Sequence, residues 1–244
     1  MANPSTTLPG VPDATGTEPH REGGGSVYVY QIPIRLWHWA TVAAISTLAL
    51  TGYFIGSPLP SVGGEASDSF LFGYIRSAHF IAGYVLAIGL VARTWWALVG
   101  NVHARQIYTV PVRDPKFLDE LWWQVRWYSF LASEPRKHVG HNPLARLTMF
   151  FLFLQTALFL SVTGLALYSE GEGIESWQYK AFGWVFSLFG SSQRVHTLHH
   201  VGMWVMLLFV MTHVYAAIRE DIMGRASILS TMISGWRNFR DTRE

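Results

Sequence analysis

Four histidines lie in or beside a run of apolar residues that is long enough to cross a membrane. The run reads HTLHHVGMWVMLLFVMTH, residues 196–213, and its histidines are His196, His199, His200 and His213. A neutral imidazole binds a metal ion through one ring nitrogen, while the other nitrogen donates a hydrogen bond that fixes the ring. Ionisable side chains at membrane depth are costly and are by default functional. These residues therefore predict a metal or cofactor site within a membrane.

Helical geometry separates these histidines from one another. His199 and His213 are 14 residues apart (213 − 199 = 14), which is about 40° short of four full turns and about 21 Å along the axis. They therefore share one face of the helix at two depths. His200 points about 140° away from His213, and His196 lies near the start of the helix, close to water. We expect His199 and His213 to be ligands and His200 and His196 not to be.

Each of the two aligned histidines has a candidate partner on another apolar segment. His79 matches His199 in depth, and His38 matches His213. The sequence has no cysteine, which excludes covalent c-type haem and iron–sulfur clusters held by cysteine. Two imidazoles fill both axial positions of a haem iron and leave electron transfer as its natural task. We expect two haem b groups; the alternative is a non-redox membrane protein whose histidines bind zinc or nothing.

Two further residues are expected to contact these cofactors. Arg93 follows His79 by 14 residues, so it lies at the depth of the other pair, where a haem propionate would neutralise its charge. Gly52 follows His38 by the same interval and would leave room for a flat macrocycle. The alternatives are an arginine that extends to the membrane surface and a glycine that serves only helix packing.

The elements that position these residues are predicted to be all α-helical. The sequence is 50% hydrophobic and only 14% charged, against roughly 25% charged in soluble domains. A net charge of +2 gives no indication of a nucleic-acid partner. About 20 apolar residues are needed to cross a bilayer, and four segments qualify: residues 36–55, 77–99, 148–167 and 198–218. We therefore expect a transmembrane four-helix bundle surrounded by lipid.

The regions outside this bundle are assigned from composition and charge. We expect residues 1–29 to form a disordered arm without a cleavable signal, residues 30–220 the membrane domain and residues 221–244 a tail. Basic residues mark the inner side of a membrane. They gather in the tail and in the connection after the second span, whereas Glu65, Asp68, Glu170, Glu172 and Glu175 lie in the other two connections. Both termini are therefore predicted to be cytoplasmic.

The long inner connection is predicted to contain a short helix, about residues 115–131. Asp114 and Pro115 form a good helix start, and Leu118, Leu121, Trp122 and Val125 fall on one face. We expect this helix to lie in the membrane interface; the alternative is a helix packed beneath the bundle with no role of its own. The remaining histidines lie in loops and are expected to face solvent: His20, His103, His138 and His141.

Two stretches carry a family resemblance. RLWHWATVAAISTLALTG, residues 35–52, and the opening stretch, residues 196–213, resemble the signature regions of the cytochrome b subunit of membrane-bound nickel–iron hydrogenases. The resemblance covers about residues 30–219. It implies haem ligands at His38, His79, His199 and His213.

This resemblance also implies partners and a role. The membrane would be the inner membrane of a bacterium, and the partners are a nickel–iron large subunit and an iron–sulfur small subunit on its periplasmic face. Electrons would pass from the small subunit through two haems to a membrane quinone, and the chain would have no hydrogen-splitting site of its own. The alternative is the equivalent dihaem subunit of another periplasmic dehydrogenase, such as formate dehydrogenase.

Overall fold

The computed structural model describes residues 26–58, 70–225 and 227–238. Most of the expected N-terminal arm, together with His20, Glu65 and Asp68, lies outside this range. Within it, four helical rods are long and apolar enough to cross a membrane: α1 (Ile32–Gly56), α2 (Leu71–Val99), the rod Pro143–Glu172 and α9 (Ser192–Gly224). The predicted multi-pass bundle of membrane helices is confirmed.

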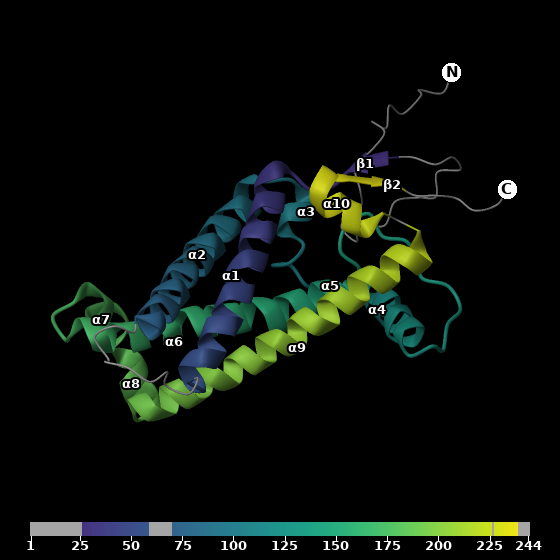
Figure 1. Cartoon of the computed structure of the whole chain (residues 1–244). Coiled ribbons are helices and arrows are strands. Elements are labelled where there is room, and N and C mark those ends of the chain that lie inside the picture. Colours follow the sequence, from purple (N-terminus) through teal and green to yellow (C-terminus); the bar gives the residue numbers. More distant parts are fainter. Residues whose placement is uncertain (1–25, 59–69, 226, 239–244) are drawn as a thin grey trace, which may run out of the picture.

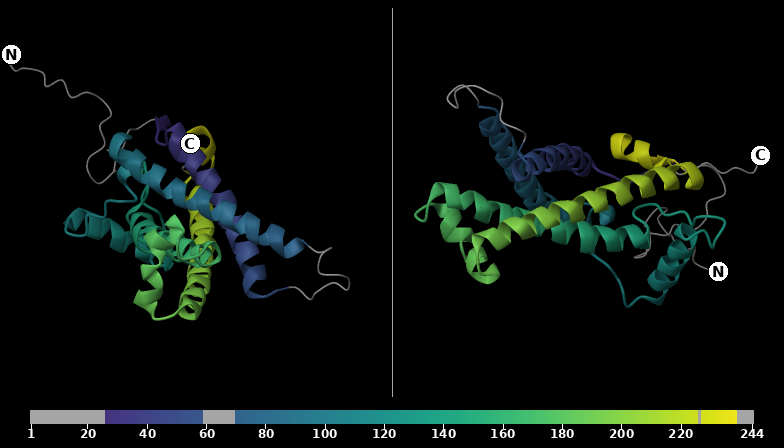
Figure 2. Two further views of the ribbon diagram at one scale, coloured as in Figure 1. Left: turned by 90° about the vertical axis from the view of Figure 1, so that its left-hand side faces the viewer. Right: turned by 60° about the horizontal axis from the view of Figure 1, so that its bottom comes forward.

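The bundle consists of two helix pairs. Helix α1 packs mainly on α2, and α9 packs on α6 (Gln155–Glu172). Figure 2 shows the first pair crossing the second. Helices α7 (Trp177–Phe182) and α8 (Trp184–Phe189) lie at one end of the bundle, which we call the α7–α8 end (Figure 1).

The opposite end carries a two-stranded ribbon, and we call it the sheet end. Strand β1 (Ser26–Tyr28) pairs antiparallel with β2 (Trp236–Asn238), beside α3 (Val102–Arg105) and α10 (Ile228–Ser234) (Figure 1). This ribbon was not expected, because β1 falls in the predicted disordered arm and β2 in the predicted tail. The two strands meet only through long-range packing, which leaves no local pattern in the sequence.

The third rod is not a uniform α-helix. It begins as α5 (Pro143–Thr148), continues as a π-helical segment, η2 (Met149–Leu154), and ends as α6. Such π-segments are rare and often lie at functional sites. Phe153 of this segment packs with Met206 and Phe209 of α9 in the central apolar cluster. The cluster lies between the depths of His199 and His213.

The short helix of the long connection is α4 (Pro115–Tyr128). Its start is capped as predicted, because the Asp114 side chain accepts a hydrogen bond of 3.0 Å from the backbone N–H of Lys116. Gln124 and Trp127 are 1% exposed and face the bundle, whereas Trp122 is 62% exposed. Helix α4 therefore packs beneath the bundle on one face and leaves an apolar face open, as an interfacial helix requires.

Candidate functional site: two histidine pairs

The histidine pair nearer the α7–α8 end is formed by α2 and α9. The ring centres of His79 and His199 are 6.4 Å apart. An imidazole nitrogen binds a metal ion at about 2 Å and lies about 1 Å from the centre of its own ring, so two collinear ligands place their ring centres roughly 6 Å apart. The observed separation fits one iron ion between the two rings.

The second pair lies nearer the sheet end and is formed by α1 and α9. The ring centres of His38 and His213 are 6.5 Å apart, and His213 also stacks on Phe209. A protein-only zinc site needs three or four ligands, and no such cluster of His, Cys, Asp or Glu occurs among the residues that the structure describes. Two-ligand sites of this spacing fit a metal that brings its own equatorial ligands, as haem iron does.

A threonine on the neighbouring helix holds each histidine of the first pair. Oγ1 of Thr51 in α1 is 2.9 Å from Nδ1 of His79, and Oγ1 of Thr163 in α6 is 2.8 Å from Nδ1 of His199. Both hydroxyls donate their own proton to a backbone carbonyl four residues earlier, so the imidazole Nδ1–H must be the donor to the threonine. This tautomer leaves Nε2 of each ring free to bind a metal.

A glycine follows each of these threonines and makes room for the ring. A Cβ atom at Gly52 would lie 3.1 Å from Cε1 of His79, and one at Gly164 would lie 3.2 Å from Cε1 of His199. Gly52 therefore adjoins an imidazole, and its expected contact with a macrocycle stays a prediction. Sequence reasoning missed Thr51, Thr163 and Gly164, although the Thr-Gly dipeptide recurs in the first and third spans at the same depth.

The other histidines of the opening stretch lie apart from both pairs. His200 sits against α1, where a Cβ at Gly56 would be 3.0 Å from its Cε1, and its ring meets Trp204 edge-on. Nδ1 of His196 lies 3.1 Å from the backbone oxygen of Ser192 in the first turn of α9. The structure thus brings His199, and neither of these two residues, next to His79.

Arg93 is buried near the second pair. It is 3% exposed, and its Nη2 donates a 2.7 Å hydrogen bond to the backbone oxygen of Ala104. Its guanidinium lies over the rings of Trp37 and Tyr108 at 5.4 and 5.5 Å, which is within cation–π range. Nε and Nη1 are buried with no partner in the part of the chain that the structure describes. The side chain does not extend to the surface, and its unpaired donors fit an anionic group such as a carboxylate.

A buried polar cluster lies beyond the second pair, at the sheet end. The hydroxyl of Tyr30 is 3.2 Å from Nδ1 of His141, whose backbone N–H donates to Gln106 at 3.0 Å. Burial raises the pKa of Tyr30 and lowers the pKa of His141 well below its usual value. His103 and His138 are only 6% and 8% exposed. The expectation that these histidines lie in loops and face solvent was wrong, because His103 lies in α3 and the loop with His138 and His141 folds under the bundle.

Comparisons with known proteins identify the family of this chain. The family model described as prokaryotic cytochrome b561 matches residues 29–235. A protein of Azotobacter vinelandii is 58% identical over 89% of this chain and 91% of its own length; one of Cupriavidus necator is 52% identical over 95% and 96%. A protein of Escherichia coli K12 is 45% identical over 88% and 92%. The first two are named probable Ni/Fe-hydrogenase B-type cytochrome subunit, and the third probable Ni/Fe-hydrogenase 1 B-type cytochrome subunit. The chain belongs to the prokaryotic cytochrome b561 family, which implies that it binds b-type haem.

Proposed function

We propose that this chain is the dihaem membrane subunit of a nickel–iron hydrogenase and passes electrons from its iron–sulfur subunit to a membrane quinone. The observation that carries the proposal is the pair of ring separations, 6.4 Å for His79 with His199 and 6.5 Å for His38 with His213. Both fit an iron ion with two axial imidazoles. The names of the relatives support the hydrogenase as the partner.

The residues have distinct tasks in this proposal. Haem, when bound, would supply one-electron redox chemistry at two depths in the membrane. Each histidine pair would hold one haem through both of its imidazoles, which would suit electron transfer and not the binding of oxygen or substrate. Thr51 and Thr163 would fix the tautomer of the ligands nearer the α7–α8 end. Arg93 would neutralise a haem carboxylate nearer the sheet end.

The direction of electron flow follows from orientation. We propose that the sheet end, which carries the basic connection, faces the cytoplasm and that the α7–α8 end faces the periplasm. The periplasmic hydrogenase would dock at the α7–α8 end, and electrons would travel toward the second pair. Quinone would then be reduced near the sheet end, beside α1 and the long connection, where protons and lipid are both within reach.

Purification in a gentle detergent tests this proposal. We expect the chain to co-purify with a nickel–iron subunit and an iron–sulfur subunit, to contain two haems per chain and to lose all haem to acidified acetone. Hydrogen should reduce both haems, and added quinone should reoxidise them. Haem that stays on the polypeptide, or one iron per chain, would contradict the two-pair arrangement. Co-purification with a formate-oxidising subunit would assign the chain to a different dehydrogenase.

A further inference from the structure

The Glu220 carboxyl group lies at the sheet end, and one of its oxygens accepts hydrogen bonds from three neutral side chains. Its Oε1 accepts hydrogen bonds from Nε2 of Gln124 at 2.6 Å, from the hydroxyl of Tyr128 at 3.2 Å and from Nδ2 of Asn142. Gln124 and Tyr128 belong to α4, and Asn142 caps the start of α5. Because these donors are neutral, the carboxyl group can gain or lose a proton without breaking an ion pair with them.

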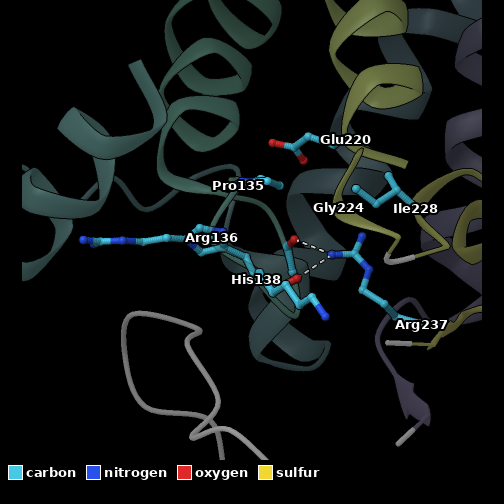
Figure 3. Close-up of a pocket in the computed structure, with 9 residues that line it drawn as sticks. Pro135, Arg136, His138, Glu220, Gly224, Ile228 and Arg237 are labelled. Atoms are coloured by element: carbon cyan, nitrogen blue, oxygen red, sulfur yellow. Dashed lines mark hydrogen bonds between the residues drawn. The ribbon is translucent and has the colours of Figure 1, made fainter. Parts of the chain in front are cut away.

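Glu220 also lines a cavity that reaches the surface of the sheet end. The loop before α5 forms the opposite wall with Arg136, whose side chain is 36% exposed, and with His138. Figure 3 shows the Arg237 guanidinium bonded to the backbone oxygens of His138 and Gly140, both at 2.8 Å. Charged side chains line this cavity, which is large enough to hold water, so the Glu220 carboxyl group has a route to bulk protons.

The other side of Glu220 leads toward the second histidine pair. Glu220 follows His213 by seven residues (220 − 213 = 7), which is about 20° short of two turns and about 10 Å along α9. The two residues therefore share a face of the helix. Asn142, which donates to Glu220, is preceded by His141, and the charges of Arg93 and His213 both act on the His141 ring. Glu220 thus lies between the cavity and the level of His213 on α9, next to the polar cluster around His141.

The titratable and charged groups that face Glu220 come from several elements. Tyr128 lies on α4, His138 lies in the loop before α5 and Arg237 lies on β2. The charge of Glu220 also contributes to the raised pKa of Tyr30, which precedes α1. Arg219, the neighbour of Glu220 on α9, points elsewhere and donates to the last carbonyl groups of α4.

We propose that Glu220 delivers protons to quinone at the sheet end. This inference rests on the proposed function. Conversion of one quinone to quinol takes two electrons and two protons. The electrons originate from hydrogen oxidised by the partner and arrive one at a time through the second pair. For each proton delivered, the Glu220 carboxylic acid becomes a carboxylate and then recovers a proton from water in the cavity, so Glu220 is unchanged at the end of the cycle.

The test compares Glu220→Gln with Asp221→Asn in the complete hydrogenase complex. The glutamine keeps an oxygen that accepts the three hydrogen bonds but cannot release a proton, and Asp221 is the next residue on the same helix. We expect Glu220→Gln to keep two haems per chain and the normal rate of haem reduction by hydrogen. Quinone reduction should slow by about a hundredfold and should recover partly as the pH falls. Asp221→Asn should behave as the wild type.

Two further measurements separate proton transfer from a structural role. Infrared difference spectra during turnover should contain a protonated-carboxyl band in the wild type and in Asp221→Asn, and this band should be absent from Glu220→Gln. Glu220→Asp, which keeps a carboxyl group, should retain more quinone reduction than Glu220→Gln. Wild-type rates in Glu220→Gln, equal rates in the two Glu220 variants, or haem loss in Glu220→Gln would each overturn the inference. A different result would overturn the proposed function instead: hydrogen reduces the haems of the wild-type complex, but quinone does not reoxidise them.

Discussion

Thr51 on α1 and His79 on α2 are joined by a contact of 2.9 Å between the threonine Oγ1 and the imidazole Nδ1. The threonine hydroxyl proton is already bound to the backbone oxygen of Thr47 at 2.6 Å. Thr51 can therefore only accept from the imidazole, and it fixes which ring nitrogen of His79 is available to a metal. A side chain of one helix thus determines the tautomer of a histidine on another.

Replacing Thr51 with Val should weaken the haem nearer the α7–α8 end. Valine has the same shape but cannot accept the Nδ1–H, and loss of such a partner typically costs about 10–100-fold in metal affinity. Haem content and a redox titration should show the change in one haem only. Thr51→Ser should behave as the wild type. Thr47→Val is the matched control, because the Thr47 hydroxyl donates only to Ala43; an equal effect of Thr47→Val would refute the role of the hydroxyl.

Replacing Gly52 with Ala should displace the His79 ring. The new Cβ would lie 3.1 Å from Cε1, closer than ordinary van der Waals contact, so the ring must move from its place opposite His199. We expect an altered spectrum and a shifted potential for the haem nearer the α7–α8 end. Gly73→Ala on α2 is the control, because nothing lies within 4 Å of its Cβ position. Normal spectra in both variants would show that the ring has room to adjust.

Replacing His199 should remove one haem, whereas replacing the adjacent His200 should not. His199 is paired with His79, and His200 packs against α1 beside Trp204. His199→Ala should keep one haem per chain, held by His38 and His213, and hydrogen should no longer reduce it. His200→Ala should keep two. Haem loss in His200→Ala combined with two haems in His199→Ala would contradict the shared-face geometry.

Replacing Arg93 with Leu should lower the content or the potential of the haem nearer the sheet end. Two donor nitrogens of Arg93 are buried without a partner among the described residues, and a haem carboxylate would lose its counter-charge in the variant. Arg93→Lys should have a smaller effect because it keeps the charge. A redox titration in two steps resolves the two haems. An unchanged titration would show that the guanidinium interacts only with the Ala104 carbonyl group and the neighbouring aromatic rings.

The contact between Glu120 and His138 should make the sheet end sensitive to acid. Nε2 of His138 lies 3.4 Å from Oε2 of Glu120, and this contact, followed by a hydrogen bond from Arg136, lowers the pKa of Glu120 below its usual 4.5. A lowered folded-state pKa gives stability that is present above pH 4.5 and is lost as the pH falls through the folded value. Thermal unfolding from pH 3 to 7 should show this loss. Glu120→Gln should unfold earlier at pH 7 and should show a smaller acid effect; an identical acid profile would exclude the pair as its source.

The sequence predicted the four spans because apolar length is a local property of the chain. It also aligned His199 with His213, since both lie on one unbroken helix whose period is fixed. The roles of Thr51 and Thr163 were not predicted, because the hydroxyl of a threonine within a helix normally forms a hydrogen bond only with the backbone of its own helix. The contact with an imidazole depends on a neighbouring helix. The burial of His138 likewise depends on Arg237, which lies far away in the sequence.

Both histidine pairs cross the seam between the two helix pairs of the bundle. His38 and His79 come from α1 and α2, whereas His199 and His213 both come from α9. Each helix pair can enter a bilayer as a hairpin, since its backbone groups are satisfied within its own helices. Cofactor insertion would then be the last step of biogenesis and would fasten the hairpins together at two heights. A chain produced in cells that cannot make haem should have all four spans inserted but should be cut more readily by proteases at the seam.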